Sequence, residues 1–155
     1  MEENIVIRKA NCDDLSDIKQ CIQQSFEKYI ARIDKKPAPM LKNYDEYIKN
    51  DTAFVLEYEK RLVGLIVLIT KEDYVLLDTV AVAPAFQGKS LGKHLLQFAE
   101  TFTRQNGKNE IRLLTNEKMY ENIEIYNHYG YIEYARGKEN GYHRVYFKKE
   151  LGSIC

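Results

Sequence analysis

The 155-residue sequence predicts an α+β fold in which helices flank a mixed β-sheet. Three strand-like segments follow one another in the middle of the chain, and strands then alternate with helices. Composition agrees, since 45% hydrophobic and 30% charged residues are ordinary proportions for a chain that buries a core. No repeat or low-complexity linker divides the sequence, so we expect a single domain over residues 1–155 with the element order β-α-α-β-β-β-α-β-α-β-β.

The N-terminal third predicts one strand and two helices. Alternating apolar residues predict the strand at residues 4–8. Residues 11–14 offer capping side chains, and apolar residues then recur every three or four positions from Leu15 to Ile33, as on one face of a helix. Two prolines within residues 34–39 end that helix, and residues 43–48 predict a second, short one.

The remaining two thirds predict six strands and two helices. The strands are expected at residues 53–59, 62–70, 74–83, 111–115, 131–136 and 142–148. The first two form a hairpin candidate, because only Lys60 and Arg61 separate them. The helices are expected at residues 88–106 and 119–129, each followed by a glycine that can end it.

Charge and cysteine usage narrow the class of partner. Lys plus Arg equal Asp plus Glu at 23 each, which argues against a general nucleic-acid or anionic-membrane binder and favours a small molecule. Cys12, Cys21 and Cys155 form no CxxC pair and have no clustered histidines, a pattern typical of free thiols without a metal site. The acidic N-terminus is no signal peptide, and the longest apolar run, residues 62–69, is too short to cross a bilayer. We therefore expect a cytoplasmic location.

The segment from Val80 to Lys93 has the features of an anion site. A strand pattern ends at Pro84, and a loop with small residues leads directly into the amphipathic pattern of a helix. The first turn of a helix carries unpaired N–H groups and partial positive charge, and glycine lets a phosphate approach the backbone closely. Lys89 and Lys93 add positive charge to this segment.

Two other interpretations of this segment remain. It could be an ordinary strand-to-helix connection with glycine at the helix start. Gly88-Lys89-Ser90 also matches the end of the Walker phosphate loop, G-x-x-x-x-G-K-[ST]. That motif requires its first glycine at the position of Ala83, and Pro84 would lie inside the loop, so the nucleotide-triphosphatase interpretation fits less well.

The stretch Gln87-Gly88-Lys89-Ser90-Leu91-Gly92 resembles motif A of the GNAT acyltransferase superfamily, Gln/Arg-x-x-Gly-x-Gly/Ala, with Ser90 in place of the central glycine. The resemblance implies that the loop amides bind the pyrophosphate of coenzyme A and that the preceding strand pairs with its pantetheine arm. The cofactor-binding residues expected from it are Val80, Ala81, Val82, Gln87, Gly88, Lys89, Ser90, Leu91, Gly92, Lys93 and Asn122.

A second stretch, from Leu114 to Tyr131, resembles motif B of the same family: a strand, an Asn-bearing loop, a helix containing Tyr, and a Gly-aromatic ending. With the last strand, the resemblance covers nearly the whole chain. It implies a mostly antiparallel mixed sheet and direct transfer of acetyl from acetyl-CoA to a primary amine of a small molecule or peptide, without a metal. An acetyl-CoA-binding regulatory module without transfer is the alternative, and a homodimer is plausible.

The resemblance also suggests roles for single residues. Tyr126 corresponds to the family tyrosine that protonates the departing thiolate, or it simply packs in the core. Asn122 contacts the coenzyme or caps the helix. Asp78 and Glu117 are the candidate bases for the acceptor amine, with water as the third choice. The acceptor site is expected within residues 26–47, where charge gives no lead on the substrate.

Overall fold

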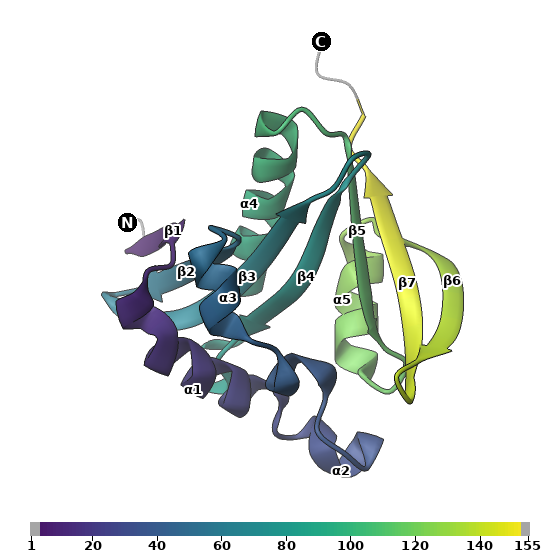
Figure 1. Cartoon of the computed structure of the whole chain (residues 1–155), viewed down its shortest axis with the longest axis horizontal. Helices are drawn as coiled ribbons and strands as arrows, with labels where there is room; N and C mark the ends of the chain where they lie inside the picture. The colour runs from purple at the N-terminus through teal and green to yellow at the C-terminus, as the bar shows by residue number, and fades with distance from the viewer. Residues whose placement is uncertain (1–3, 153–155) are drawn as a thin grey trace. The chain divides into compact units, whose positions relative to one another are not determined.

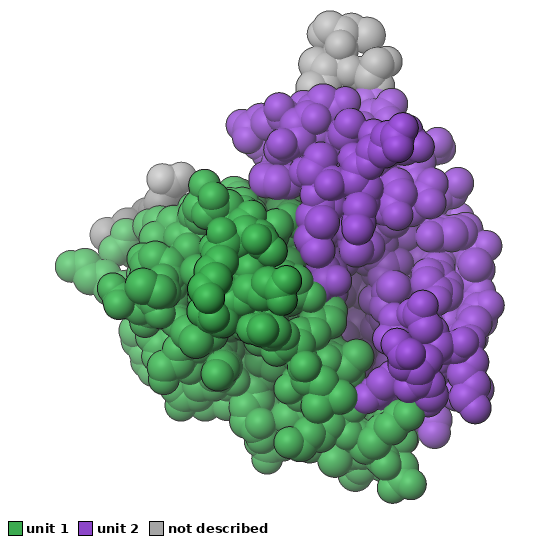
Figure 2. All heavy atoms as spheres, viewed as in Figure 1, with its two compact units in different colours: residues 1–68, 79–99 green, residues 69–78, 100–155 purple. Residues whose placement is uncertain are grey.

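The computed structural model describes residues 4–152 and divides the chain into two compact units (Figure 2). The first unit comprises Met1–Leu68 and Thr79–Ala99, and the second comprises Ile69–Asp78 and Glu100–Cys155. Cys155, expected to carry a free thiol, and the acidic first three residues lie outside the described residues.

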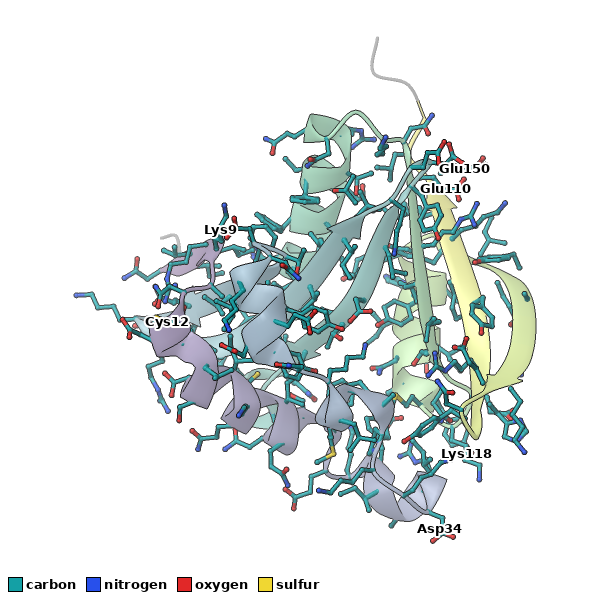
Figure 3. All side chains as sticks on the ribbon, viewed as in Figure 1. Lys9, Cys12, Asp34, Glu110, Lys118 and Glu150 are labelled. Atoms are coloured by element: carbon teal, nitrogen blue, oxygen red, sulfur yellow. The ribbon has the colours of Figure 1, made fainter. Side chains whose placement is uncertain are left out.

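The strands form one seven-stranded sheet with the hydrogen-bonded order β1-β2-β3-β4-β5-β7-β6 (Figure 1). Their bounds are β1 Ile5–Lys9, β2 Ala53–Tyr58, β3 Arg61–Thr70, β4 Val75–Val82, β5 Glu110–Asn116, β6 Ile132–Glu139 and β7 Tyr142–Glu150. The pairs β1–β2, β2–β3, β5–β7 and β6–β7 are antiparallel, whereas β4 and β5 run parallel. Glu110 and Glu150 mark the end of the β5–β7 ladder, where they are register partners (Figure 3). The predicted mixed, mostly antiparallel sheet is confirmed.

One predicted helix is divided in two. The helices are α1 Leu15–Phe26, α2 Tyr29–Ile33, α3 Tyr44–Lys49, α4 Leu91–Gln105 and α5 Tyr120–His128, with short 3₁₀ turns at Cys12–Asp14, Ala38–Leu41 and Pro84–Phe86. The prediction of a single helix from Leu15 to Ile33 was wrong. The Ile30 N–H donates to Glu27 O, three residues back, which tightens the turn between α1 and α2. The apolar stripe crosses this break because Phe26 and Tyr29 are both buried and their rings lie 6.1 Å apart.

In the first unit, helices cover the core strands β2 and β3 (Figure 1). Gly64 of β3 allows the close packing: a Cβ there would lie 3.2 Å from Leu56 Cβ and 3.4 Å from Leu95 Cδ1 of α4. The β2–β3 hairpin turns at Glu59 and Lys60, whose φ angles are 52° and 69°. Positive φ at both central residues is typical of the type I′ turn that suits strand twist.

In the second unit, α5 packs against the buried face of β5 and β7. Tyr126 of α5 contacts Phe147 of β7 with ring centroids 5.9 Å apart, and Phe147 is fully buried. Every residue of the edge strand β6 is exposed. Glu133 and Arg136 form an ion pair at 2.7 Å on this strand, where charged side chains discourage pairing with another chain.

The start of the first helical segment is fixed by a buried carboxylate, as the capping residues predict. Asp14 is only 7% exposed and accepts from both Arg8 guanidinium nitrogens at 2.8 and 2.9 Å. The Asn11 N–H donates to the same carboxylate at 2.8 Å, and the Asn11 side chain accepts from Asp13, which completes a capping box.

We expect Asp14→Asn to destabilise the protein by about 2 kcal/mol near neutral pH, because it removes the acceptor charge from a buried, charge-assisted pair. The Arg8 hydrogen bonds hold the pKa of Asp14 below its ordinary value of 3.8. Because the folded-state pKa of Asp14 is lowered, the ionised carboxylate stabilises the folded protein fully at pH values above the unfolded-state pKa. This stabilisation is lost as the pH falls through the folded-state pKa. Urea unfolding should show that the difference in free energy of unfolding between the wild type and Asp14→Asn is smaller at about pH 3 than at neutral pH. An advantage of equal size at both pH values would contradict this account.

Candidate functional site

The candidate site begins at the end of β4, where two side chains hold one carbonyl. Ser25 Oγ of α1 donates to Val82 O at 3.1 Å, and Gln87 Nε2 donates to the same oxygen at 3.0 Å. The Val82 carbonyl thus already has two donors. Sequence reasoning missed Ser25, because it lies 57 residues before Val82 and belongs to no motif.

The N–H of Val82 faces away from β3. The following N–H, of Ala83, donates to Val63 O of β3 at 2.8 Å. Successive N–H groups of a strand point to opposite edges, so the Val82 N–H points to the other edge. The β4–β5 ladder pairs Val75, Leu76 and Leu77 with β5, so Val80 to Val82 lie beyond its end.

Two residues of the loop that follows β4 have left-handed backbone conformations. Pro84 begins a 3₁₀ turn, and residues 87–90 are exposed. Gly88 has φ 86° and Ser90 has φ 63°, both in the left-handed region. Ser90 therefore adopts a backbone conformation that glycine adopts more readily than other residues do.

Helix α4 begins at Leu91, three residues later than predicted. Its first backbone bond runs from the His94 N–H to Ser90 O at 3.2 Å. Within residues 4–152, the amides from Gly88 to Lys93 donate to no backbone carbonyl. A Cβ placed on Gly92 would meet nothing within 4 Å. The helix start therefore offers open space, unpaired donors and positive dipole charge.

An aromatic and basic cluster lies beside this loop. The Tyr58 and Phe86 rings are 5.9 Å apart, edge to face. Lys89 Nζ lies 5.9 Å from the Tyr58 ring centroid, and the Arg61 guanidinium lies 5.2 Å from that of Phe86. These cation–π contacts keep two positive charges near the helix start, where they suit an anionic ligand. Tyr58, Arg61 and Phe86 could not be recognised from the sequence pattern, because the cluster combines the β2–β3 hairpin with the loop after β4.

We expect substitutions of Ser90 to report its left-handed conformation. Ser90→Gly should stabilise the protein by about 0.5 kcal/mol, since relief of strain outweighs the extra freedom of the unfolded chain. Ser90→Val should destabilise it by more than about 1 kcal/mol, because a β-branched side chain is strongly disfavoured at positive φ. Urea unfolding measures both changes. Equal stability of the two variants would argue against a left-handed residue 90.

Asn122 and Tyr126 belong to the second unit. Asn122 is the third residue of α5, whose N-cap is Met119, so the alternative that Asn122 caps this helix was wrong. The Asn122 Nδ2 lies 3.7 Å from Met119 Sδ, a weak contact on a half-exposed side chain. Asn116 forms the turn before the helix, because its Oδ1 accepts from the Lys118 N–H at 2.9 Å (Lys118 is labelled in Figure 3).

Tyr126 lies in an aromatic cluster of the second unit. Only 7% of it is exposed, and its ring lies 5.9 Å from those of Tyr131 and Phe147. Tyr131 is 3% exposed, and its burial raises the pKa of its phenol well above the ordinary value of 10.0. The ring of Tyr126 is thus buried against two aromatic neighbours, one in the α5–β6 connection and one in β7.

The candidate bases differ in their surroundings. Asp78 is half-buried on β4 and shares its strand face with Val80 and Val82, as the alternation predicts. Glu117 follows β5, its N–H donates to His143 O at 2.9 Å, and its Oε1 lies 3.8 Å from His143 Nδ1. His94 and His128 are both exposed.

Among residues 4–152, no three His, Cys, Asp or Glu side chains are grouped so that they could hold a metal ion. No helix in the same range is long and apolar enough to cross a membrane.

Comparisons with known proteins give a consistent result. A family model described as Acetyltransferase (GNAT) family matches residues 16–131. The PaiA N-acetyltransferase of Thermoplasma acidophilum, solved in complex with coenzyme A, is 19% identical with a TM-score of 0.74, over 95% of this chain and 99% of that chain. An acetyltransferase of the GNAT family from Streptococcus agalactiae is 20% identical with a TM-score of 0.79, over 96% of each chain. An IAA acetyltransferase from Bacillus cereus is 18% identical with a TM-score of 0.71, over 96% of this chain and all of that one (100%). No curated protein matches the sequence.

Proposed function

The chain belongs to the GNAT acetyltransferase family, and we propose that it transfers acetyl from acetyl-CoA directly to a primary amine of a small molecule or peptide. The observation that carries the proposal is the loop from Gln87 to Lys93. Its left-handed residues, exposed amides and neighbouring lysines fit a pyrophosphate, while the open space at Gly92 lets the anion approach the helix start.

The loop and β4 would hold the two halves of the coenzyme. The amides from Gly88 to Lys93 bind the pyrophosphate, and Lys89 and Lys93 add charge. The pantetheine arm runs along Val80, Ala81 and Val82, beyond the end of the β4–β5 ladder. The Val82 carbonyl is engaged by Ser25 and Gln87, so Val82 offers the ligand only its N–H.

The same N–H is suited to the chemical step. The neutral amine attacks the thioester carbonyl, a C–N bond forms, and the carbonyl oxygen becomes an oxyanion. The Val82 N–H, pointing away from β3, donates to that oxygen. Ser25 and Gln87 fix the strand end, so the donor is oriented before the substrate arrives.

Three proton transfers complete the reaction. The C–S bond breaks, and Tyr126 gives its proton to the coenzyme A thiolate. A phenol with an ordinary pKa of about 10 keeps its proton at neutral pH until a thiolate with a pKa of about 8.5 departs. The amine loses its proton to Asp78, Glu117 or water, and Tyr126 regains a proton from solvent.

Calorimetric titration with acetyl-CoA, with ATP plus magnesium as the control, tests the proposal. We expect acetyl-CoA alone to bind, with a Kd on the order of micromolar. Binding of ATP alone would favour the nucleotide-triphosphatase interpretation. A thiol-release assay with free amino acids, linear polyamines and short peptides then tests transfer. Tight binding without thiol release from any of these amines would favour the regulatory module.

A further inference from the structure

Two basic side chains extend the positive surface of the candidate loop onto the β2–β3 hairpin. Arg61 begins β3, Lys89 lies in the loop after β4, and both side chains are exposed. In the part of the chain that the structure describes, the side chains of Arg61 and Lys89 form no ion pair and no hydrogen bond. Both charges can therefore meet an anion that approaches this surface.

Aromatic rings hold these two cations in place. The Arg61 guanidinium lies 5.2 Å from the Phe86 ring centroid, and Lys89 Nζ lies 5.9 Å from that of Tyr58. The two rings contact each other edge to face with centroids 5.9 Å apart, so the hairpin and the loop form one cluster. A long basic side chain loses conformational freedom when it binds a ligand. The ring contacts restrict both side chains beforehand, which lowers that cost.

The charge of this surface has one dominant sign. Residues 59–61 and 84–93 contain four basic side chains and one acidic side chain: Lys60, Arg61, Lys89, Lys93 and Glu59. Glu57, the next acidic residue before the turn, is paired with Arg8 at 3.1 Å. The whole chain has no net charge, so this excess of positive charge is a local feature that attracts anions to the hairpin and the loop.

The chemistry of the proposed coenzyme indicates which anion reaches this surface. Besides its pyrophosphate, coenzyme A carries a phosphate monoester on the 3′-oxygen of its ribose. Only one sugar separates the two groups, so a pyrophosphate held by residues 88–93 keeps the 3′-phosphate close to the loop. The monoester carries nearly two negative charges at neutral pH and offers three acceptor oxygens, which suit a pair of cations.

We propose that Arg61 and Lys89 form a subsite for the 3′-phosphate of coenzyme A, through which the protein selects the 3′-phosphorylated coenzyme over its dephosphorylated form. The inference rests on the proposed function, in which the loop binds the pyrophosphate. The planar guanidinium of Arg61 donates to two phosphate oxygens, and the ammonium of Lys89 donates to the third. The 3′-phosphate is remote from the thioester, so the subsite acts on binding of the coenzyme and not on the chemical step.

Acetyl-dephospho-CoA lacks only the 3′-phosphate and tests the subsite directly. In calorimetric titrations of the wild type, its Kd should exceed that of acetyl-CoA about tenfold or more, and added salt should reduce the ratio. Arg61→Gln should weaken binding of acetyl-CoA about tenfold and leave the Kd for acetyl-dephospho-CoA unchanged within about twofold. Because Arg61 is exposed, the thermal midpoint of the variant should equal that of the wild type.

Three further variants separate a subsite from a general effect of charge. Lys19→Gln removes a positive charge from an exposed position of α1 in the same unit and should change neither Kd. Arg61→Lys should retain part of the preference, because it keeps the charge without the planar fork. Phe86→Leu removes the ring beside Arg61 and should lower the ratio of the two Kd values about threefold.

The outcomes distinguish the inference from the function beneath it. If the wild type binds neither form of the coenzyme, the proposed function and the inference both fail. If the wild type binds acetyl-CoA and acetyl-dephospho-CoA equally well, the inference alone is wrong, and the comparison needs no variant. The inference is also wrong if Arg61→Gln weakens both forms to the same extent, or if Lys19→Gln weakens acetyl-CoA as much as Arg61→Gln does.

Discussion

Replacing Tyr126 by phenylalanine should lower kcat for acetyl transfer by about a hundredfold to a thousandfold, because a positioned general acid contributes on that order. The thiolate would then leave without a proton. The variant keeps the ring that packs 5.9 Å from Phe147, so the fold should be preserved. Because the hydroxyl acts on the leaving group, the Kd for acetyl-CoA should change by less than about threefold. Steady-state kinetics and calorimetric titration measure the two quantities.

Tyr129→Phe serves as the control, since Tyr129 is half-exposed and lies three residues after Tyr126. The proposed role of Tyr126 would be untenable if its phenylalanine variant turned over at the wild-type rate. A variant that lost acetyl-CoA binding as well would point to a packing role, because a missing general acid affects the reaction and not the ground-state complex.

Gly92→Asp should weaken acetyl-CoA binding about a hundredfold or more. A carboxylate in the first turn of α4 would stand within a few ångströms of the proposed pyrophosphate, where repulsion at an effective dielectric constant of about 20 is several kcal/mol. The same carboxylate would interact favourably with the positive end of the helix dipole, and the space around Gly92 is open. The variant should therefore be at least as stable as the wild type. Calorimetric titration and thermal unfolding together separate these effects.

Gln97→Glu provides the matched charge change on an exposed position of the same helix. It should leave the Kd for acetyl-CoA unchanged within about twofold, since a solvent-exposed charge about one and a half turns away acts weakly. Equal losses of affinity in the two variants would indicate a general charge effect. If Gly92→Asp bound acetyl-CoA as tightly as the wild type, the loop would be an ordinary helix start and not the pyrophosphate site.

Local patterns predicted most of the elements because each signal lies within a few residues. The strand ending before Pro84, the helix stop at Gly107 with φ 74° and the stop at Gly130 with φ 89° follow from residue types whose backbone preferences are strong. The division between α1 and α2 could not be predicted this way. The apolar stripe from Leu15 to Ile33 is continuous in sequence, and only packing of Phe26 beside Tyr29 shows how a tight turn preserves it.

The same distinction holds for the candidate site. The sequence alone pointed to the candidate phosphate loop and, through the family resemblance, to the candidate acid Tyr126, because glycines, lysines and motif spacing are local properties of the chain. Only the tertiary structure decided that Ser90 adopts a left-handed conformation, that Ser25 holds the Val82 carbonyl and that the Tyr131 hydroxyl is buried unpaired. Hydrogen bonds between distant segments and the exclusion of water depend on how elements pack, and no local pattern encodes the partner that a folded chain brings to a given atom.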